Sequence, residues 1–91
     1  MTADEIAARE LILYAENDQP LYKRFLYWKE NFDAKKKRGV YNRELAIKGL
    51  ENNYVPEIIK KYKKEFGLGN IDAATKKIVA INFVDIYEQG D

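Results

Sequence analysis

The chain has 91 residues, of which 46% are hydrophobic and 34% are charged, and its formal net charge is +1. This length predicts a single domain over residues 1–91, and the balance of apolar and charged residues is typical of a folded protein. Cys is absent, which excludes disulfides and thiolate metal sites. No apolar run is long enough for a signal peptide or a membrane span, so we expect a soluble cytoplasmic protein that does not enter a membrane.

The first predicted helix runs from about residue 3 to residue 16, behind a capping box formed by Thr2 and Glu5. Asp18 and Pro20 then favour a second helix start, because Asp is a good N-cap and Pro is tolerated in a first turn. The second helix ends at Gly39, and its apolar stripe consists of Leu21, Phe25, Trp28 and Phe32. So short a connection predicts an antiparallel hairpin of these two helices.

The next segment begins at a predicted N-cap, Asn42, and runs from Arg43 to Phe66. Its apolar stripe keeps helical phase across Pro56 and consists of Ile47, Leu50, Tyr54, Ile58 and Tyr62. An interior proline costs a helix roughly 3 kcal/mol, so the segment is either one helix kinked at Pro56 or two helices. The unbroken stripe favours the kinked helix, with Pro56 towards solvent.

The last predicted helix covers about residues 73–88, after a stop at residues 67–70 and an N-cap at Asp72. Residues 78–84 are rich in β-branched side chains, which is typical of a strand. A lone strand would have no partner in this chain, so the helix is favoured. We therefore predict an all-α fold, a compact bundle of four helices whose third helix is long and kinked at Pro56.

Three short runs form a pattern: Glu10-Leu11 with Tyr14 to Asp18 and Leu21-Tyr22, then Lys35 to Asn42 with Leu45-Ala46, then Lys60-Lys61-Tyr62 with Glu65-Phe66-Gly67. This pattern resembles a group of uncharacterised open reading frames from bacteria, phages and mobile elements. The resemblance covers roughly residues 9–67 and implies an all-helical fold, with no catalytic activity attached. Pro56 stands where the group tends to have small helix-forming residues, which bears on the straightness of the third helix.

Catalytic residue types are scarce. His, Cys and Ser are all absent, and Thr2 and Thr75 lie at predicted helix starts where capping accounts for them. Glu16 and Asp18 form the one candidate carboxylate pair, but they flank a turn where capping and solvation also account for them. No loop has the spacing of a phosphate or calcium site. We therefore expect a binding module that is not an enzyme and has no cofactor, metal ion or catalytic residue.

The charge is unevenly distributed. Residues 23–43 hold eight cations against two anions, whereas residues 1–22 hold one cation against five anions. The predicted polyanion-binding residues are Lys35, Lys36, Lys37, Arg38, Tyr41 and Arg43, with Tyr41 or Tyr27 available to stack on a base. Two other interpretations stay open: a solvated helix end stabilised by the helix dipole, partly neutralised by the acidic first helix, or a site for an acidic protein.

The last predicted helix is apolar almost all round, which suggests a second surface. Ile78 and Ile81 point away from the side that holds Phe83 and Tyr87. We expect these four residues to contact a protein partner or a second copy of the chain, unless the helix is wrapped on both sides. The main hypothesis is therefore a protein-binding module, and the alternative is binding of nucleic acid or another polyanion through residues 35–43.

Overall fold

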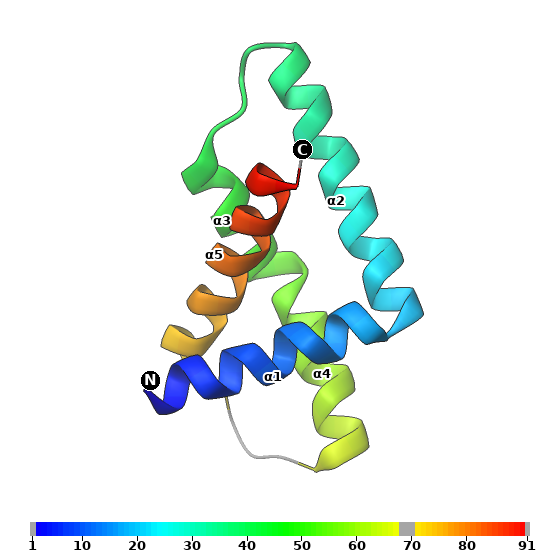
Figure 1. Cartoon of the computed structure of the whole chain (residues 1–91), viewed down its shortest axis with the longest axis vertical. Helices are drawn as coiled ribbons and strands as arrows, with labels where there is room; N and C mark the ends of the chain where they lie inside the picture. Colours follow the sequence, from blue (N-terminus) through cyan, green and yellow to red (C-terminus); the bar gives the residue numbers. More distant parts are fainter. Residues whose placement is uncertain (1, 68–70, 91) are drawn as a thin grey trace.

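The computed structural model describes residues 2–67 and 71–90, and every regular element within those residues is an α-helix (Figure 1). The helices are α1 (Ala3–Asn17), α2 (Gln19–Lys37), α3 (Arg43–Asn53), α4 (Val55–Phe66) and α5 (Ala73–Gln89). Because α3 and α4 follow one another as a single long bent helix, the chain forms the predicted bundle of four. None of the described helices combines the length and apolar composition that crossing a membrane requires.

The predicted N-caps are confirmed, because each side chain accepts a hydrogen bond from the backbone amide three residues on. The distances are 3.2 Å for Thr2, 3.1 Å for Asp18, 3.1 Å for Asn42 and 2.8 Å for Asp72. Gly39 follows α2 with φ 71° and Gly67 follows α4 with φ 66°, a region that favours glycine. The rest of the predicted stop, Leu68, Gly69 and Asn70, lies outside the described residues.

The bend between α3 and α4 falls at Tyr54, two residues before Pro56. Proline has no amide hydrogen to donate to the preceding turn, and its ring clashes with the carbonyl four residues back. The Tyr54 amide still donates to the Leu50 carbonyl (2.9 Å), and the Tyr54 carbonyl accepts from the amide of Glu57 (3.0 Å). Pro56 is exposed, as predicted, while Tyr54 and Ile58 are fully buried, so both halves pack into one core.

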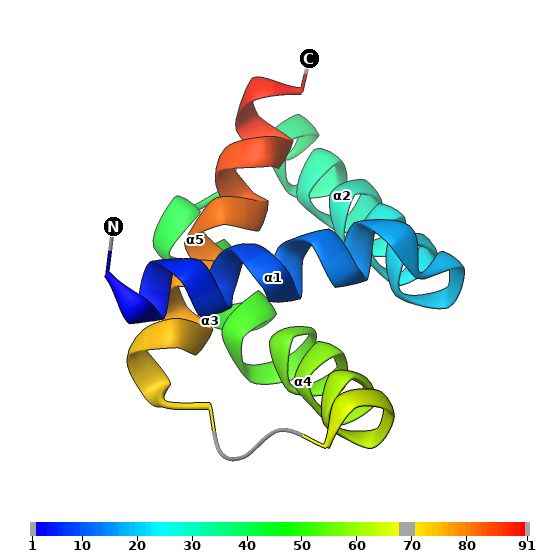
Figure 2. The same cartoon turned by 60° about the horizontal axis from the view of Figure 1, so that its bottom comes forward.

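The predicted antiparallel hairpin of the first two helices is wrong. The single residue Asp18, with φ −100° and ψ 112°, separates α1 from α2. From there α2 runs steeply away from α1 instead of folding back along it (Figures 1 and 2). A one-residue connection in an extended conformation turns the chain direction but leaves no loop to bring the helices side by side.

The core lies around α5, which packs against α1, α3 and α4. Six α5 residues are buried, Thr75, Val79, Ala80, Phe83, Val84 and Tyr87, so the β-branched run is confirmed as a core helix. In contrast, α2 has 19 residues and buries only Leu21, Phe25 and Phe32. Trp28, the fourth member of the predicted α2 stripe, is half-buried, and its ring lies over Gly49 of α3, 3.6 Å from the position that a Cβ on that glycine would take.

Candidate binding surfaces

The predicted partner surface on α5 requires a correction. Phe83 and Tyr87 are each 1% exposed, so they belong to the core and have no surface to offer a partner. The all-round apolar character of α5 follows from its position, because neighbouring helices cover it on several sides. Ile78 and Ile81 are half-buried and lie at the edges of this packing. Of the four predicted residues, these two alone keep accessible surface.

Ile78 lines a surface groove between α1 and α5. The groove has a volume of about 490 Å³, and the side chains around it are Glu5, Arg9, Ile12, Leu13, Ile78 and Asn82. Leu13 is 53% exposed at its edge, and Ile6 is 49% exposed on the same side of α1. The lining therefore combines three aliphatic side chains with three charged or polar ones, and a mixture of this kind is common in protein-binding sites.

The α1 part of this surface escaped the sequence analysis. The core-facing residues of the first helix include Leu11 and Ala15, which the structure buries. Ile6 and Leu13 are seven residues apart and therefore share a helix face, but that face is turned away from the core. The sequence did contain a signal for this surface, because two large apolar residues at this spacing lie outside the core stripe.

Two of the predicted polyanion-binding residues are engaged within the protein. The Arg43 guanidinium pairs with the Asp85 carboxylate at 2.7 Å and also with Glu88, while the Tyr41 hydroxyl donates to Glu88 at 2.9 Å. Burial, together with the Glu88 hydrogen bond, raises the pKa of Tyr41 to about 12. These residues fasten the start of α3 to the end of α5, so they do not form a free basic patch.

Lys36 is engaged as well. Its ammonium lies 4.5 Å from the ring centroid of Tyr87 and 5.3 Å from that of Tyr41, a cation–π arrangement. The Tyr87 hydroxyl donates to the Asp33 carboxylate at 2.6 Å, which adds a second link between α2 and α5. The three remaining predicted cations, Lys35, Lys37 and Arg38, are exposed, and no side chain within residues 2–67 and 71–90 forms an ion pair with them.

The two members of the candidate carboxylate pair lie in different surroundings. Asp18 caps α2 and accepts from the Lys61 ammonium at 2.8 Å, and the Lys61 hydrogen bond holds the pKa of Asp18 below its usual range. Glu16 is exposed on α1. Beside them, the Tyr14 hydroxyl donates to Glu65 at 2.7 Å, and this hydrogen bond raises the pKa of Tyr14 to about 12. These contacts fasten α1 to α4 and account for the side chains involved.

Within the part of the chain that the structure describes, no group of three acidic side chains is arranged to hold a metal ion. Comparison with known protein families, with curated proteins and with solved structures finds no significant match to this chain. Two surfaces of the molecule are therefore the candidate binding sites: the α1–α5 groove and the exposed side of α2.

Proposed function

We propose that this chain is a protein-binding module whose docking surface is the α1–α5 groove, and that a second copy of the chain occupies it. The observation that carries the proposal is the exposure of Leu13 and Ile6, 53% and 49%, beside the half-buried Ile78. Three large aliphatic side chains gathered on one side of a small domain are the kind of patch that proteins cover by association.

The order of residues along α1 supports a symmetric pair. In an antiparallel pairing of two α1 helices about a two-fold axis near residues 9 and 10, Ile6 of each copy lies opposite Leu13 of the other. The same pairing places Arg9 opposite Glu10, which are of opposite charge, and brings Glu16 near the positive end of the other helix dipole. The face is therefore complementary to itself, which is what a two-fold interface requires.

The expected association is weak. Full burial of a Leu or Ile side chain contributes about 1.5–3 kcal/mol, and the two exposed α1 side chains have already lost about half of their surface to the fold. Burying the remainder in both copies contributes roughly 3–6 kcal/mol, from which the loss of rotational and translational freedom must be subtracted. We therefore expect a weak dimer that forms only near millimolar concentration, since a Kd of 1 mM already corresponds to about 4.1 kcal/mol.

Sedimentation or light scattering from about 10 μM to about 1 mM tests this, since those concentrations bracket a weak dimer. The average mass of the wild-type protein should rise towards twice the monomer mass. Leu13→Glu should keep it at the monomer mass, because it buries a charge against Ile6 of the other copy. Leu45→Glu is the matched control: Leu45 is 63% exposed on α3, outside the groove, so this variant should associate like the wild type.

Charge exchange gives a second test that does not depend on apolar contacts. Arg9→Glu and Glu10→Arg should each weaken the dimer, and the double variant should restore it, because the opposite charges face each other again across the two-fold axis. Glu10 also accepts from the Tyr62 hydroxyl at 3.1 Å, so circular dichroism of each variant must first show that the fold is retained. A wild-type protein that remains monomeric at millimolar concentration would overturn self-association. Equal association of Leu13→Glu and the wild type would show that the contact lies elsewhere on the molecule.

A further inference from the structure

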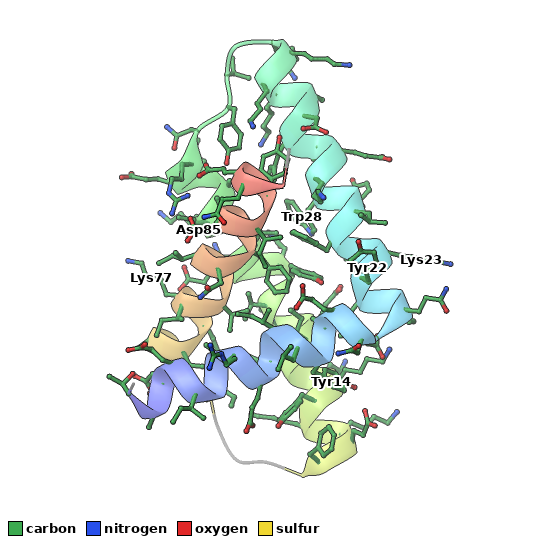
Figure 3. The ribbon with its side chains drawn as sticks, in the orientation of Figure 1. Tyr14, Tyr22, Lys23, Trp28, Lys77 and Asp85 are labelled. Carbon is green, nitrogen blue, oxygen red and sulfur yellow. The ribbon has the colours of Figure 1, made fainter. Side chains whose placement is uncertain are left out.

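Helix α2 leaves most of its surface uncovered. It is 19 residues long and buries three of them, and it forms one lateral side of the molecule, along the longest axis (Figure 1). Figure 3 shows Trp28 directed inwards and Lys23 directed away from the body of the protein. The acidic helix α1 crosses in the lower half of Figure 1, whereas the C-terminal end of α2 lies at the top of the 42 Å long axis.

One exposed ridge of α2 combines cations with an aromatic side chain. Residues four apart lie close to one another on a helix, so Lys23, Tyr27, Asn31 and Lys35 form a row, and Arg38 continues it just after the helix. Tyr27 is 57% exposed, and the three cations are exposed too. We call these five residues the α2 ridge.

Two of the three acidic residues near the α2 ridge are engaged elsewhere. Asp33 accepts from the Tyr87 hydroxyl on the α5 side, and Glu57 pairs with Arg24 at 2.9 Å. Glu30 is exposed on α2 and lies seven residues after Lys23, on the same side of the helix, so it places one anion beside the three cations of the ridge. The ridge is therefore a row of net positive charge with one exposed ring in it.

We propose that the α2 ridge binds single-stranded nucleic acid. Lys23, Lys35 and Arg38 supply charges for phosphates, and the Asn31 amide offers both a donor and an acceptor. Tyr27 supplies a ring on which an unpaired base stacks, an interaction that a duplex does not offer because its bases are already stacked. From Lys23 to Arg38 the helical rise is about 22 Å, the length of roughly six stacked nucleotides, within the usual range of single-strand site sizes.

The ridge differs from the basic segment that the sequence suggested. Tyr41, Arg43 and Lys36 are held by contacts with α5, whereas Lys23, Tyr27 and Asn31 join the site from earlier in α2. The placement of α2 also removes the expected neutralisation by α1, because the two helices diverge instead of pairing. Of the predicted cations, Lys35 and Arg38 belong to this ridge, and the exposed Lys37 lies one residue to its side.

The test is the fluorescence anisotropy of labelled 12-nucleotide DNA and RNA strands of mixed sequence, titrated with the full chain at two or more salt concentrations. Three phosphate contacts predict a slope of about −2 in a plot of log K against log salt. Lys35→Glu with Arg38→Glu should weaken binding and reduce the size of that slope by about 1.4. Lys48→Glu with Lys77→Glu, on the α3–α5 side, changes the net charge equally and should bind like the wild type.

Tyr27→Ala separates stacking from charge. It should weaken binding by roughly 5- to 150-fold, the effect of about 1–3 kcal/mol per stacked base, while leaving the salt slope unchanged. Tyr22→Ala removes another exposed tyrosine from a different side of α2 and is the matched control. Circular dichroism of each variant establishes that the fold is retained, since all of these side chains lie on the surface.

Several outcomes would overturn the proposal. The first is no binding of either strand at low salt. The second is that Lys48→Glu with Lys77→Glu weakens nucleic-acid binding as much as Lys35→Glu with Arg38→Glu does, because net charge alone would then explain the loss. The third is full competition by polyglutamate together with no effect of Tyr27→Ala, which would identify an acidic protein surface as the ligand. Tight duplex binding that does not depend on Tyr27 would overturn the single-strand assignment. The same titration with Leu13→Glu, the variant that should not dimerise, tests nucleic-acid binding independently of the proposed dimer.

Discussion

Tyr54 is the clearest test of how the bent helix is held to α2. Its side chain is fully buried, its ring lies 6.1 Å from that of Phe25 and 5.3 Å from that of Phe83, and its hydroxyl donates to the Leu21 carbonyl at 2.8 Å. Tyr54→Phe removes the hydroxyl alone and keeps the ring contacts. The Leu21 carbonyl retains its place in the α2 hydrogen-bond ladder, so the loss is one net hydrogen bond, about 0.5–1.5 kcal/mol of unfolding free energy.

For a domain of this size, 1 kcal/mol corresponds to a fall in Tm of about 4–8 °C, which thermal unfolding followed by circular dichroism resolves. Tyr27→Phe is the control, because the 57% exposed Tyr27 makes no hydrogen bond through its hydroxyl within the described residues, and its Tm should not change. An unchanged Tm for Tyr54→Phe would refute the assignment of a buried, bonded hydroxyl at the bend.

Alkaline pH sharpens the same test. Burial raises the pKa of Tyr54 above its usual range, so the neutral form is favoured in the folded state. Its contribution to stability is complete below the unfolded pKa of about 10, and is lost at about 1.4 kcal/mol per pH unit as the pH rises beyond that value. The wild type should therefore lose its advantage over Tyr54→Phe above pH 10. Parallel pH profiles of the two proteins would contradict the burial of this hydroxyl.

Two further predictions concern the helices themselves. Gly49→Ala should raise the free energy of unfolding by about 0.5–1 kcal/mol, because Ala is more favourable than Gly inside a helix. The new Cβ would lie 3.6 Å from the Trp28 ring, which is an ordinary van der Waals contact. A lower Tm in calorimetry would show that the indole cannot accept the added methyl group. Asp72→Ala should lower the Tm at neutral pH by removing the α5 cap, whereas Asp72→Asn should keep it. The hydrogen bond from the Thr75 amide lowers the pKa of Asp72, so the contribution of the Asp72 carboxylate to stability is present above about pH 4 and is lost in acid. The difference in Tm between Asp72→Ala and the wild type should therefore shrink in acid, and a constant difference would contradict this.

Local signals in the sequence were enough to predict most of the secondary structure. Each N-cap depends on a side chain that accepts a hydrogen bond from an amide three residues away, so four consecutive residues are enough to predict it. This applies to Thr2, Asp18, Asn42 and Asp72. The bend near Pro56 is equally local, because it follows from the missing amide of one residue. These features need no knowledge of the tertiary fold.

The arrangement of the helices depends on contacts between residues that are far apart in the sequence. Nothing in the run from Asn17 to Pro20 distinguishes a hairpin from two diverging helices, since both need a cap and a short turn. The burial of Phe83 and Tyr87 depends on which helices surround α5, and the engagement of Arg43 depends on Asp85, 42 positions later in the chain. Both predicted surfaces changed for this reason, because each combined residues that the fold assigns to the core or to ion pairs.

The divergence of α1 and α2 also determines what the charge distribution can do. Residues 1–22 carry five anions and one cation, and residues 23–43 carry eight cations and two anions. Had the two helices paired along their length, these charges would have lain within a few ångströms of one another and largely neutralised each other. Because α2 runs away from α1, its C-terminal cations at residues 35–38 lie roughly 25 Å of helical rise beyond Asp18, more than the screening length of about 8–10 Å at physiological salt. A chain with a net charge of +1 therefore presents an apolar face with acidic flanks on α1 and a cationic ridge on α2. An α1-mediated dimer would leave the C-terminal cations of both ridges accessible, so association and nucleic-acid binding can be tested separately on the same molecule.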